Sequence, residues 1–393
     1  AASFSTTVVS SDNVSEPGID VGPDNAIYVN GPTGLLSNLP GSPSYVFRST
    51  SGGAGWVQTP PSMRANLPGG GDSDISIAPD GSLYMTDLWL GSSTVSVSHD
   101  QANTWTANPL QGVVVQDRQW IAASGSGAVY HATHQIPTGL VVSKSLDGLV
   151  YPVTTVAATP LDQTGCVCPP GNLIAQNGGG MLGLSDDVGL IYATSSGGVN
   201  FARSTDGALT FTQATVSPAG SADTSTNFPV VANAGGGHLV ATWLEVLPNG
   251  TDRVMFNHSS DWGATWATPT AVVTTGTSVY PWIDALGTKV GISLYRTADA
   301  TATPDTAPAS ARWFESYVES TDTGATFGAI TTVDTTPAKT GPVCTGGVNC
   351  SSGRELGDFQ SIALDRSGQP DVSYIRVDPA APAGVDLMFA HGA

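Results

Sequence analysis

Apolar and polar residues alternate along the chain in a pattern that repeats seven times. In each unit an apolar run leads into a turn rich in Gly, Asp or Asn and is followed by a second apolar run, over residues 16–31, 72–87, 117–134, 172–184, 227–245, 280–296 and 358–376. Alternation with a period of two predicts strands, and no long stretch shows the 3.6-residue period of a helix. The pattern therefore predicts seven pairs of β-strands and almost no helix.

A second motif recurs after the strand pairs. Its full form, Ser-x-Asp-x-Gly-x-Thr-Trp, occupies residues 259–266, and variants occupy residues 49–56, 98–105, 145–151, 204–211 and 320–327. Asp accepts backbone N–H groups in turns, Gly supplies left-handed backbone, and the aromatic residue packs beneath. The motif therefore predicts a structured hairpin turn, in which Asp100, Asp206, Asp261 and Asp322 are structural rather than catalytic.

These turns resemble the Asp-boxes, or BNR repeats, of the sialidase-like β-propeller superfamily. The resemblance implies an all-β fold of radiating four-stranded blades, with the boxes on the face opposite the active site. Ser49 and Ser320 begin boxes five repeats apart, so one repeat spans about 54 residues and 393 residues hold about seven. We predict a single seven-bladed propeller domain over residues 1–393, with six blades as the alternative if the irregular fourth unit forms no blade.

The two ends of the chain are predicted to complete one blade together. The last unit ends in DLMFAHGA, which matches a strand that precedes a box, and no further strand follows it. The opening residues, STTVVSSDN, resemble the segments that follow other boxes. The N-terminal strand therefore supplies the missing outer strand, which removes a free sheet edge.

Composition and charge narrow the functional classes. The chain is 40% hydrophobic with 47 Gly and 27 Pro, which suits a packed core of strands and turns. Its net charge of −19 makes binding to a phosphate backbone improbable. No apolar run approaches the roughly 18 residues needed to span a bilayer. The opening AASFSTTVVS resembles a mature end left by signal-peptide removal, so we expect a secreted, extracellular protein.

Four cysteines lie in two close pairs. Cys344 and Cys350 could close a small disulfide loop, whereas Cys166 and Cys168 could form only a tight ring. The sequence does not choose among the possible pairings. Zinc binding by Cys166 and Cys168 would need a second pair of ligands at a suitable spacing, and none follows.

Candidate site residues stand where innermost strands begin or second strands end, because these positions meet at one rim of a propeller. In sialidases three arginines hold the substrate carboxylate, a Tyr paired with a Glu is the nucleophile, and an Asp is the acid/base. The resemblance implies Arg118, Arg296 and Arg376 for the arginines, Tyr280 or Tyr295 with Glu245 for the pair, and Asp74 or Asp117 for the acid. Trp120, Trp282 and Asp358 are further candidate substrate-binding residues.

Structural roles are open for several of the same residues. Asp117 and Arg118, and likewise the segment 354–359, could lock neighbouring blades together, and both tryptophans could be core plugs. Clustered carboxylates such as Asp72 and Asp74 could bind calcium. His131 and His134 are poorly spaced for shared metal ligation on a strand.

Three functions are compatible with the sequence. The first is a secreted glycoside hydrolase that acts on an acidic or neutral glycan at the rim, since carboxylates, arginines and aromatic residues are what such chemistry requires. The second is a non-catalytic propeller that binds a glycan or an extracellular protein, or that builds an assembly. The third is a polysaccharide lyase. Fold alone does not choose among them.

Overall fold

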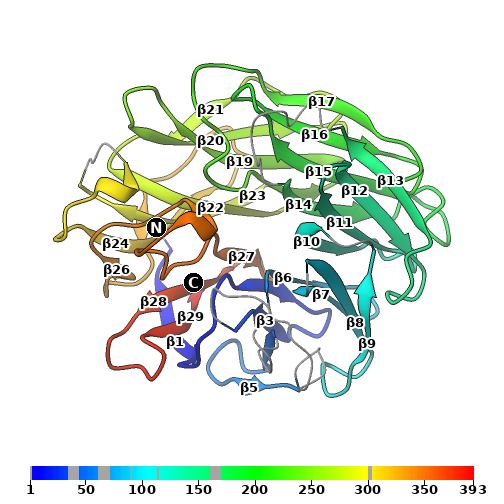
Figure 1. Cartoon of the computed structure of the whole chain (residues 1–393), viewed down its shortest axis with the longest axis horizontal. Coiled ribbons are helices and arrows are strands. Elements are labelled where there is room, and N and C mark those ends of the chain that lie inside the picture. Colours follow the sequence, from blue (N-terminus) through cyan, green and yellow to red (C-terminus); the bar gives the residue numbers. More distant parts are fainter. Residues whose placement is uncertain are drawn as a thin grey trace.

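Seven antiparallel sheets radiate from a central axis like the blades of a propeller (Figure 1). The computed structural model describes residues 2–33, 44–60, 71–89, 91–112, 115–159, 170–299 and 303–393. Successive blades follow one another around the ring in chain order, from blue through green to red in Figure 1. The all-β, seven-bladed fold predicted from the sequence is confirmed.

Each blade is numbered here by its place in the chain, and its strands run outward from the axis in the order given. Blade 1 contains β2 (Gly18–Val21), β3 (Ile27–Gly31), β4 (Tyr45–Ser49) and β5 (Val57–Gln58). Blade 2 contains β6 (Ser73–Ile77), β7 (Leu83–Trp89), β8 (Ser92–Ser98) and β9 (Thr106–Gln111). Blade 3 contains β10 (Gln116–Ala123), β11 (Val129–Gln135), β12 (Gly139–Ser145) and β13 (Val153–Ala158). Blade 4 contains β14 (Pro170–Gln176), β15 (Asp187–Ala193), β16 (Val199–Ser204) and β17 (Thr212–Ser217).

The remaining blades follow the same plan. Blade 5 contains β18 (Val230–Gly235), β19 (His238–Val246), β20 (Asp252–Ser259) and β21 (Thr270–Val273). Blade 6 contains β22 (Thr277–Leu286), β23 (Lys289–Thr297), β24 (Arg312–Ser320) and β25 (Thr331–Thr332), and β26 (Lys339–Thr340) also pairs with β24. Blade 7 contains β27 (Ser361–Leu364), β28 (Pro370–Val377), β29 (Val385–Gly392) and β1 (Phe4–Ser10).

Helix is nearly absent, as the sequence pattern predicted. The helices in the described part of the chain are two 3₁₀ turns, η2 (Pro304–Thr306) and η3 (Gly347–Asn349). Neither could cross a membrane. The irregular fourth unit does form a four-stranded blade, so the six-bladed alternative is wrong.

The N-terminal strand closes the ring, as predicted. β1 pairs antiparallel with β29, with Phe4 opposite Gly392 and Val8 opposite Met388. In Figure 1 the blue β1 lies beside the red β28 and β29. The outer strand of blade 7 thus comes from the opposite end of the chain to its other three strands.

Aspartate side chains connect neighbouring blades near the axis by hydrogen bonds. The innermost strand of each blade is a sheet edge, so the N–H groups on its axis side have no partner within their own sheet. Three aspartates accept such an N–H from the following blade, in the pairs Asp20 to Ile77, Asp74 to Ile121 and Asp284 to Leu364, at 2.8, 2.9 and 2.6 Å. Burial raises the pKa of Asp20 and Asp74 to about 7 and that of Asp284 to about 6.

Each box turn joins the third and fourth strands of a blade and is held by its own side chains. The hydroxyl of Ser259 accepts the N–H of Gly263 at 2.9 Å and donates to Asp261 at 2.8 Å. Asp261 in turn accepts the N–H of Thr265 at 2.9 Å and its hydroxyl at 2.6 Å. The boxes at Asp100, Asp206 and Asp322 repeat these bonds. The repeated Ser, Asp and Thr thus satisfy the backbone of the turn.

The glycine of the box lets adjacent blades approach closely. Gly324, in the box of blade 6, has a φ of +84° and lies against the ring of Phe256 in blade 5. A methyl group there would collide with that ring and would also occupy left-handed backbone. Replacing Gly324 with Ala is therefore expected to lower the free energy of unfolding by about 2–4 kcal/mol in a urea titration.

Gly328→Ala provides the matched control for this prediction. Gly328 lies four residues further along the chain, is exposed, and has ordinary van der Waals space around its Cα. Its replacement should change stability by less than about 0.5 kcal/mol. Equal losses in the two variants would show that the close approach of blades 5 and 6 contributes nothing specific.

Candidate functional site

Four acidic side chains meet at the end of the ring where the innermost strands begin. Glu16, Asp72, Asp117 and Asp358 precede or open the innermost strands of blades 1, 2, 3 and 7. Their charges act on one another, because Asp72 and Asp358 each raise the pKa of both Glu16 and Asp117. We call the end of the ring that carries these four residues the carboxylate face. The box turns lie on the opposite face, because the first and third strands of each blade run in the same direction.

Two arginines hold this cluster together across blade boundaries. Arg354 contacts Asp358 at 2.6 Å and reaches Glu16 of blade 1 at 3.4 Å. Arg118 of blade 3 lies 3.6 Å from the Asp72 carboxylate of blade 2 and donates to the carbonyl of Ser73 at 3.4 Å. The blade-to-blade contacts predicted for these two segments are therefore present, although Arg118 reaches back to the preceding blade.

Burial and crowding favour the protonated form of two of the acids. Glu16 is buried, and burial together with the Asp72 and Asp358 charges raises its pKa well above the usual value. The Asp117 residue is exposed to solvent, but desolvation by the surrounding atoms and the nearby Asp72 charge raise its pKa as well. The site thus combines carboxyl groups that tend to retain a proton with others that face guanidinium groups.

Strained backbone accumulates at the carboxylate face. Glu16, Arg118 and Tyr280 have φ values of 47°, 49° and 56°, which side chains other than glycine rarely adopt. The pairing of β10 with β11 and of β22 with β23 is irregular at the same places. Such strain is typical of functional sites, where it fixes the direction of a side chain.

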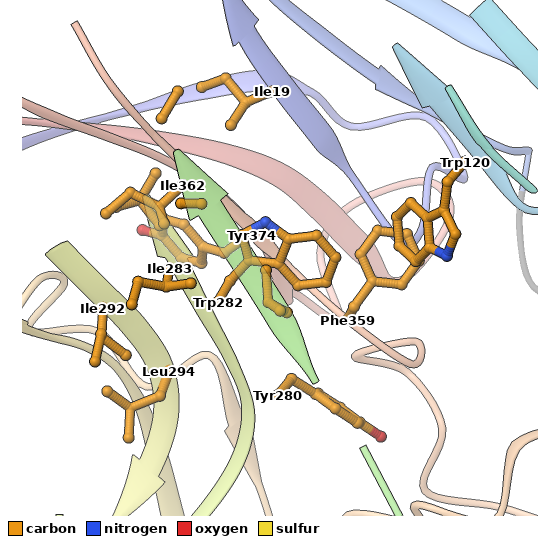
Figure 2. Close-up of a cluster of buried hydrophobic side chains, with 14 of the residues drawn as sticks. Ile19, Trp120, Tyr280, Trp282, Ile283, Ile292, Leu294, Phe359, Ile362 and Tyr374 are labelled. Carbon is orange, nitrogen blue, oxygen red and sulfur yellow. The ribbon is translucent and has the colours of Figure 1, made fainter. Parts of the chain in front are cut away.

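An aromatic cluster plugs the axis next to the acids. Trp282 stacks on Phe359 at 5.3 Å between ring centres, and Trp120 lies 5.8 Å from Phe359 and 5.7 Å from Phe228. Figure 2 shows Trp282 beside Phe359, with Trp120 beyond it. The guanidinium of Arg118 lies 3.7 Å above the Trp120 ring. Both tryptophans are buried in this plug, so neither presents an open platform to a sugar.

A cavity continues along the axis from the plug toward the box face. Its volume is about 280 Å³, and the innermost strands of all seven blades line it. Asp74 lines this cavity and bonds to blade 3, and it stands apart from the surface at which the other candidate acids meet solvent. The structure therefore places Asp74 in a blade-to-blade contact.

The arginines and the glutamate implied by the sialidase resemblance occupy separate places. Arg296 donates to the carbonyl of Thr275 at 2.9 Å, and Glu245 forms a 2.7 Å ion pair with Arg253 in its own blade. Arg376 binds Asp334, which follows β25 of blade 6, at 3.3 Å, and Asp386 of blade 7 at 3.1 Å. Only Arg118 of the three predicted arginines contacts the acidic cluster, so the sialidase-type arrangement is not assembled by these contacts.

The two candidate tyrosines are both buried. The hydroxyl of Tyr280 donates to the carbonyl of Cys344 at 3.3 Å, and that of Tyr295 lies 3.3 Å from the carbonyl of Ile375. Burial raises the pKa of both phenols, and the neighbouring Asp358 raises that of Tyr280 further. Neither tyrosine contacts Glu245 through these bonds.

A disulfide closes a short loop at the edge of the acidic cluster. Cys344 and Cys350 are bonded, as expected, and the Cα of Gly347 within their loop faces the Asp358 carboxylate. Cys166 and Cys168 lie outside the described residues. Within the described ranges, no group of three or more His, Cys, Asp or Glu side chains is arranged to hold a metal ion, and Asp72 and Asp74 form no such group.

Glu16 and Arg354 are the members of the cluster that sequence reasoning left out of its candidate site. The signal for Glu16 was present, since it opens the first repeat unit just as Asp72, Asp117 and Asp358 open theirs. Arg354 was among the residues expected where an innermost strand begins, and its segment was also considered as a possible lock between blades. Its contacts with two acids of different blades follow from ring closure, which brings residues 16 and 354 together.

The blade number, the box turns and the closing strand define a seven-bladed β-propeller. No protein-family model matches the chain, and no curated protein matches it. Among solved structures, the chain is similar to the lectin BP39L from Burkholderia pseudomallei (TM-score 0.58, 12% identity, 96% of each chain covered). It is also similar to the phage phi92 endosialidase (TM-score 0.56, 10% identity, 99% of this chain and 69% of that one).

A third similar structure is the α-L-arabinofuranosidase Arb93A from Fusarium graminearum (TM-score 0.54, 11% identity, 100% of this chain and 98% of that one). At these identities the similarity shows a shared fold. The structural neighbours include glycoside-hydrolysing propellers and a lectin, and they do not select one activity.

Proposed function

We propose that the protein is a secreted glycoside hydrolase whose chemistry takes place at the carboxylate face. The observation that carries this proposal is Asp117, a solvent-exposed carboxyl whose pKa is raised, next to Asp72, a carboxylate that faces Arg118. A carboxyl that retains its proton beside a second carboxyl group is the kind of pair that glycoside hydrolysis uses. The disulfide is compatible with an extracellular location.

Each group has a distinct role in the proposed reaction. Asp117 donates its proton to the glycosidic oxygen as the bond to the anomeric carbon breaks, and a water molecule then adds its hydroxyl to that carbon and returns its other proton to Asp117. Asp72 stabilises the positive charge that develops on the sugar ring, and the guanidinium of Arg118, 3.6 Å away, holds Asp72 in place. Asp358, held by Arg354, faces the same charge from blade 7.

A panel of aryl glycosides and oligosaccharides tests the proposal, and it should include arabinofuranosides and sialosides because enzymes for these sugars share the fold. We expect turnover of at least one member, with release of a free reducing sugar. Products that absorb in the ultraviolet because they carry a new double bond would instead indicate a lyase. Absence of turnover across the panel would contradict the proposal.

Binding without hydrolysis is the second candidate function. It is favoured by the engagement of Arg118 and Arg354 in ion pairs between blades, because those contacts account for both guanidiniums without a substrate. The lectin among the similar structures supports it. Isothermal titration calorimetry with the same panel separates the two functions, since binding without turnover supports this one alone.

A further inference from the structure

A second pocket lies on the box face, between blades 1 and 2. Its volume is about 320 Å³, at the lower end of the 300–1,000 Å³ typical of ligand sites. Pro23 and Asp24 line it from the turn of blade 1, and Asp80 and His99 line it from blade 2. The ring of Tyr28 lines it as well. The pocket is on the opposite face of the ring from Asp117 and is independent of the proposed hydrolase site.

The polar groups of this pocket leave an excess of negative charge. One oxygen of Asp80 accepts the N–H of Ser82 at 2.9 Å, and Asp24 accepts the side-chain amide of Gln101 at 2.9 Å. The hydroxyl of Ser82 lies 2.8 Å from Nδ1 of His99, which directs Nε2 of that ring away from the contact.

Arg366 reaches the carbonyl of the lining residue Gly22, and the other guanidinium beside this pocket is that of Arg48. Its guanidinium donates to the Gln101 carbonyl at 2.5 Å and hydrogen-bonds the Tyr28 hydroxyl. Among the described residues, the pocket lining contains two carboxylates, those of Asp24 and Asp80, and no Lys or Arg, so the pocket suits a positively charged ligand.

The junction between blades 7 and 1 shows which side chain fills the corresponding position. The turns of blades 7 and 1 close with the same pattern of backbone bonds, from Asp365 to Gln369 and from Gly22 to Ala26. Arg366 and Pro23 therefore occupy equivalent positions. The side chain of Arg366 crosses from blade 7 and donates to the carbonyl of Gly22 in blade 1 at 3.4 Å. Pro23 is too short to cross in the same way from blade 1 to blade 2, and the pocket lies there.

We propose that the pocket between blades 1 and 2 binds a guanidinium group, supplied by an arginine side chain of a partner protein. Asp24 and Asp80 contribute opposite charge, and the planar cation lies against Tyr28 as guanidinium groups do on aromatic rings. The net charge of −19 steers a basic partner toward the protein.

The test compares two peptides that differ in one charged group. Acetyl-Gly-Arg-Gly-amide and the same peptide with citrulline are titrated against the folded protein while NMR shifts or heats are recorded. Citrulline has the shape of arginine without its charge, so binding of the arginine peptide alone is expected, with at least about tenfold weakening in Asp80→Asn. Agmatine, a small molecule with the same guanidinium, should bind more weakly than the peptide if the partner is a protein.

Pro23→Arg is the sharpest variant, because it should place a guanidinium in the pocket as Arg366 does at the neighbouring junction. It should abolish peptide binding and leave the melting temperature unchanged or raised. Asp365→Asn, in the neighbouring turn, is the control and should bind normally. Equal binding of the citrulline peptide, tighter binding of agmatine, unchanged binding in Pro23→Arg, or no binding of the arginine peptide would each overturn the proposal.

Discussion

Replacing Asp117 with Asn is expected to lower glycoside turnover by about 10²–10⁴-fold and to leave folding intact. The amide cannot deliver a proton to the leaving oxygen, whereas its oxygen can still accept the N–H of Arg118, which Asp117 now accepts at 2.8 Å. The measurement is kcat with a substrate that has a poor leaving group. A substrate with a good leaving group should lose far less, because its departure needs little proton transfer.

Asp299→Asn is the matched control for this loss. Asp299 is an exposed carboxylate on blade 6, after the end of β23. The raised pKa of Asp117 also predicts that wild-type activity falls as pH rises through that pKa, because the proton is then lost. If Asp117→Asn retains full activity with a poor leaving group, then Asp117 is not the acid.

The free energy of unfolding of the propeller is expected to fall as pH rises, because of the buried aspartates that hydrogen-bond neighbouring blades. Asp20 and Asp74 have raised pKa values of about 7 in the folded protein. Between about pH 4 and pH 7 the folded state keeps protons that the unfolded state has released, and above about pH 7 the folded state loses them too. The stabilisation is thus complete below about pH 4 and is lost as pH rises through about 7, on the order of 4 kcal/mol for each group.

Asp74→Asn isolates this effect from other titrating groups. The amide oxygen can still accept the N–H of Ile121, but it carries no charge at any pH. The variant should therefore gain stability relative to the wild type between pH 4.5 and pH 8, as measured by urea unfolding at each pH. The buried His131, whose pKa is lowered to about 3, opposes the trend below about pH 6.5 but contributes equally to both proteins.

Asp261→Asn supplies the opposite case for the same experiment. Desolvation raises the pKa of Asp261, but the hydrogen bonds from Thr265 and Ser259 together outweigh it and lower that pKa to about 2. Its stabilisation is lost only as pH falls through about 2, so its replacement should cost the same amount throughout the range from pH 5 to pH 8. A stability difference for Asp74→Asn that is equally flat would show that Asp74 is ionised throughout.

The fold could be predicted from the sequence because its repeats express local chemistry. Each box encodes a turn that its own Ser, Asp and Thr satisfy, and each unit encodes a strand pair, so counting them gives the ring. Closure of the ring could also be predicted from the sequence, because the opening residues resemble the outer strands of other blades. These signals need no knowledge of contacts between distant residues.

The candidate site was only partly predictable, because it depends on which side chains the ring brings together. Asp117, Arg118 and Asp358 were placed correctly at the face where innermost strands begin. Asp74 lies just two residues after Asp72, yet it points to a backbone N–H of the next blade. Residues on the same face of the propeller therefore need not belong to one site. Glu245 and Arg376 form ion pairs with residues outside the acidic cluster, and the repeat alignment could not reveal those pairs.

The pairing of β1 with β29 has a consequence for biosynthesis. β1 is synthesised before the other strands of the ring, yet it cannot pair until residues 385–392 have been made. Until then the growing chain holds an unpaired N-terminal strand and an open ring with exposed edges, both of which invite aggregation. Folding of this protein in a cell therefore depends on protecting residues 4–10 until β29 has been made.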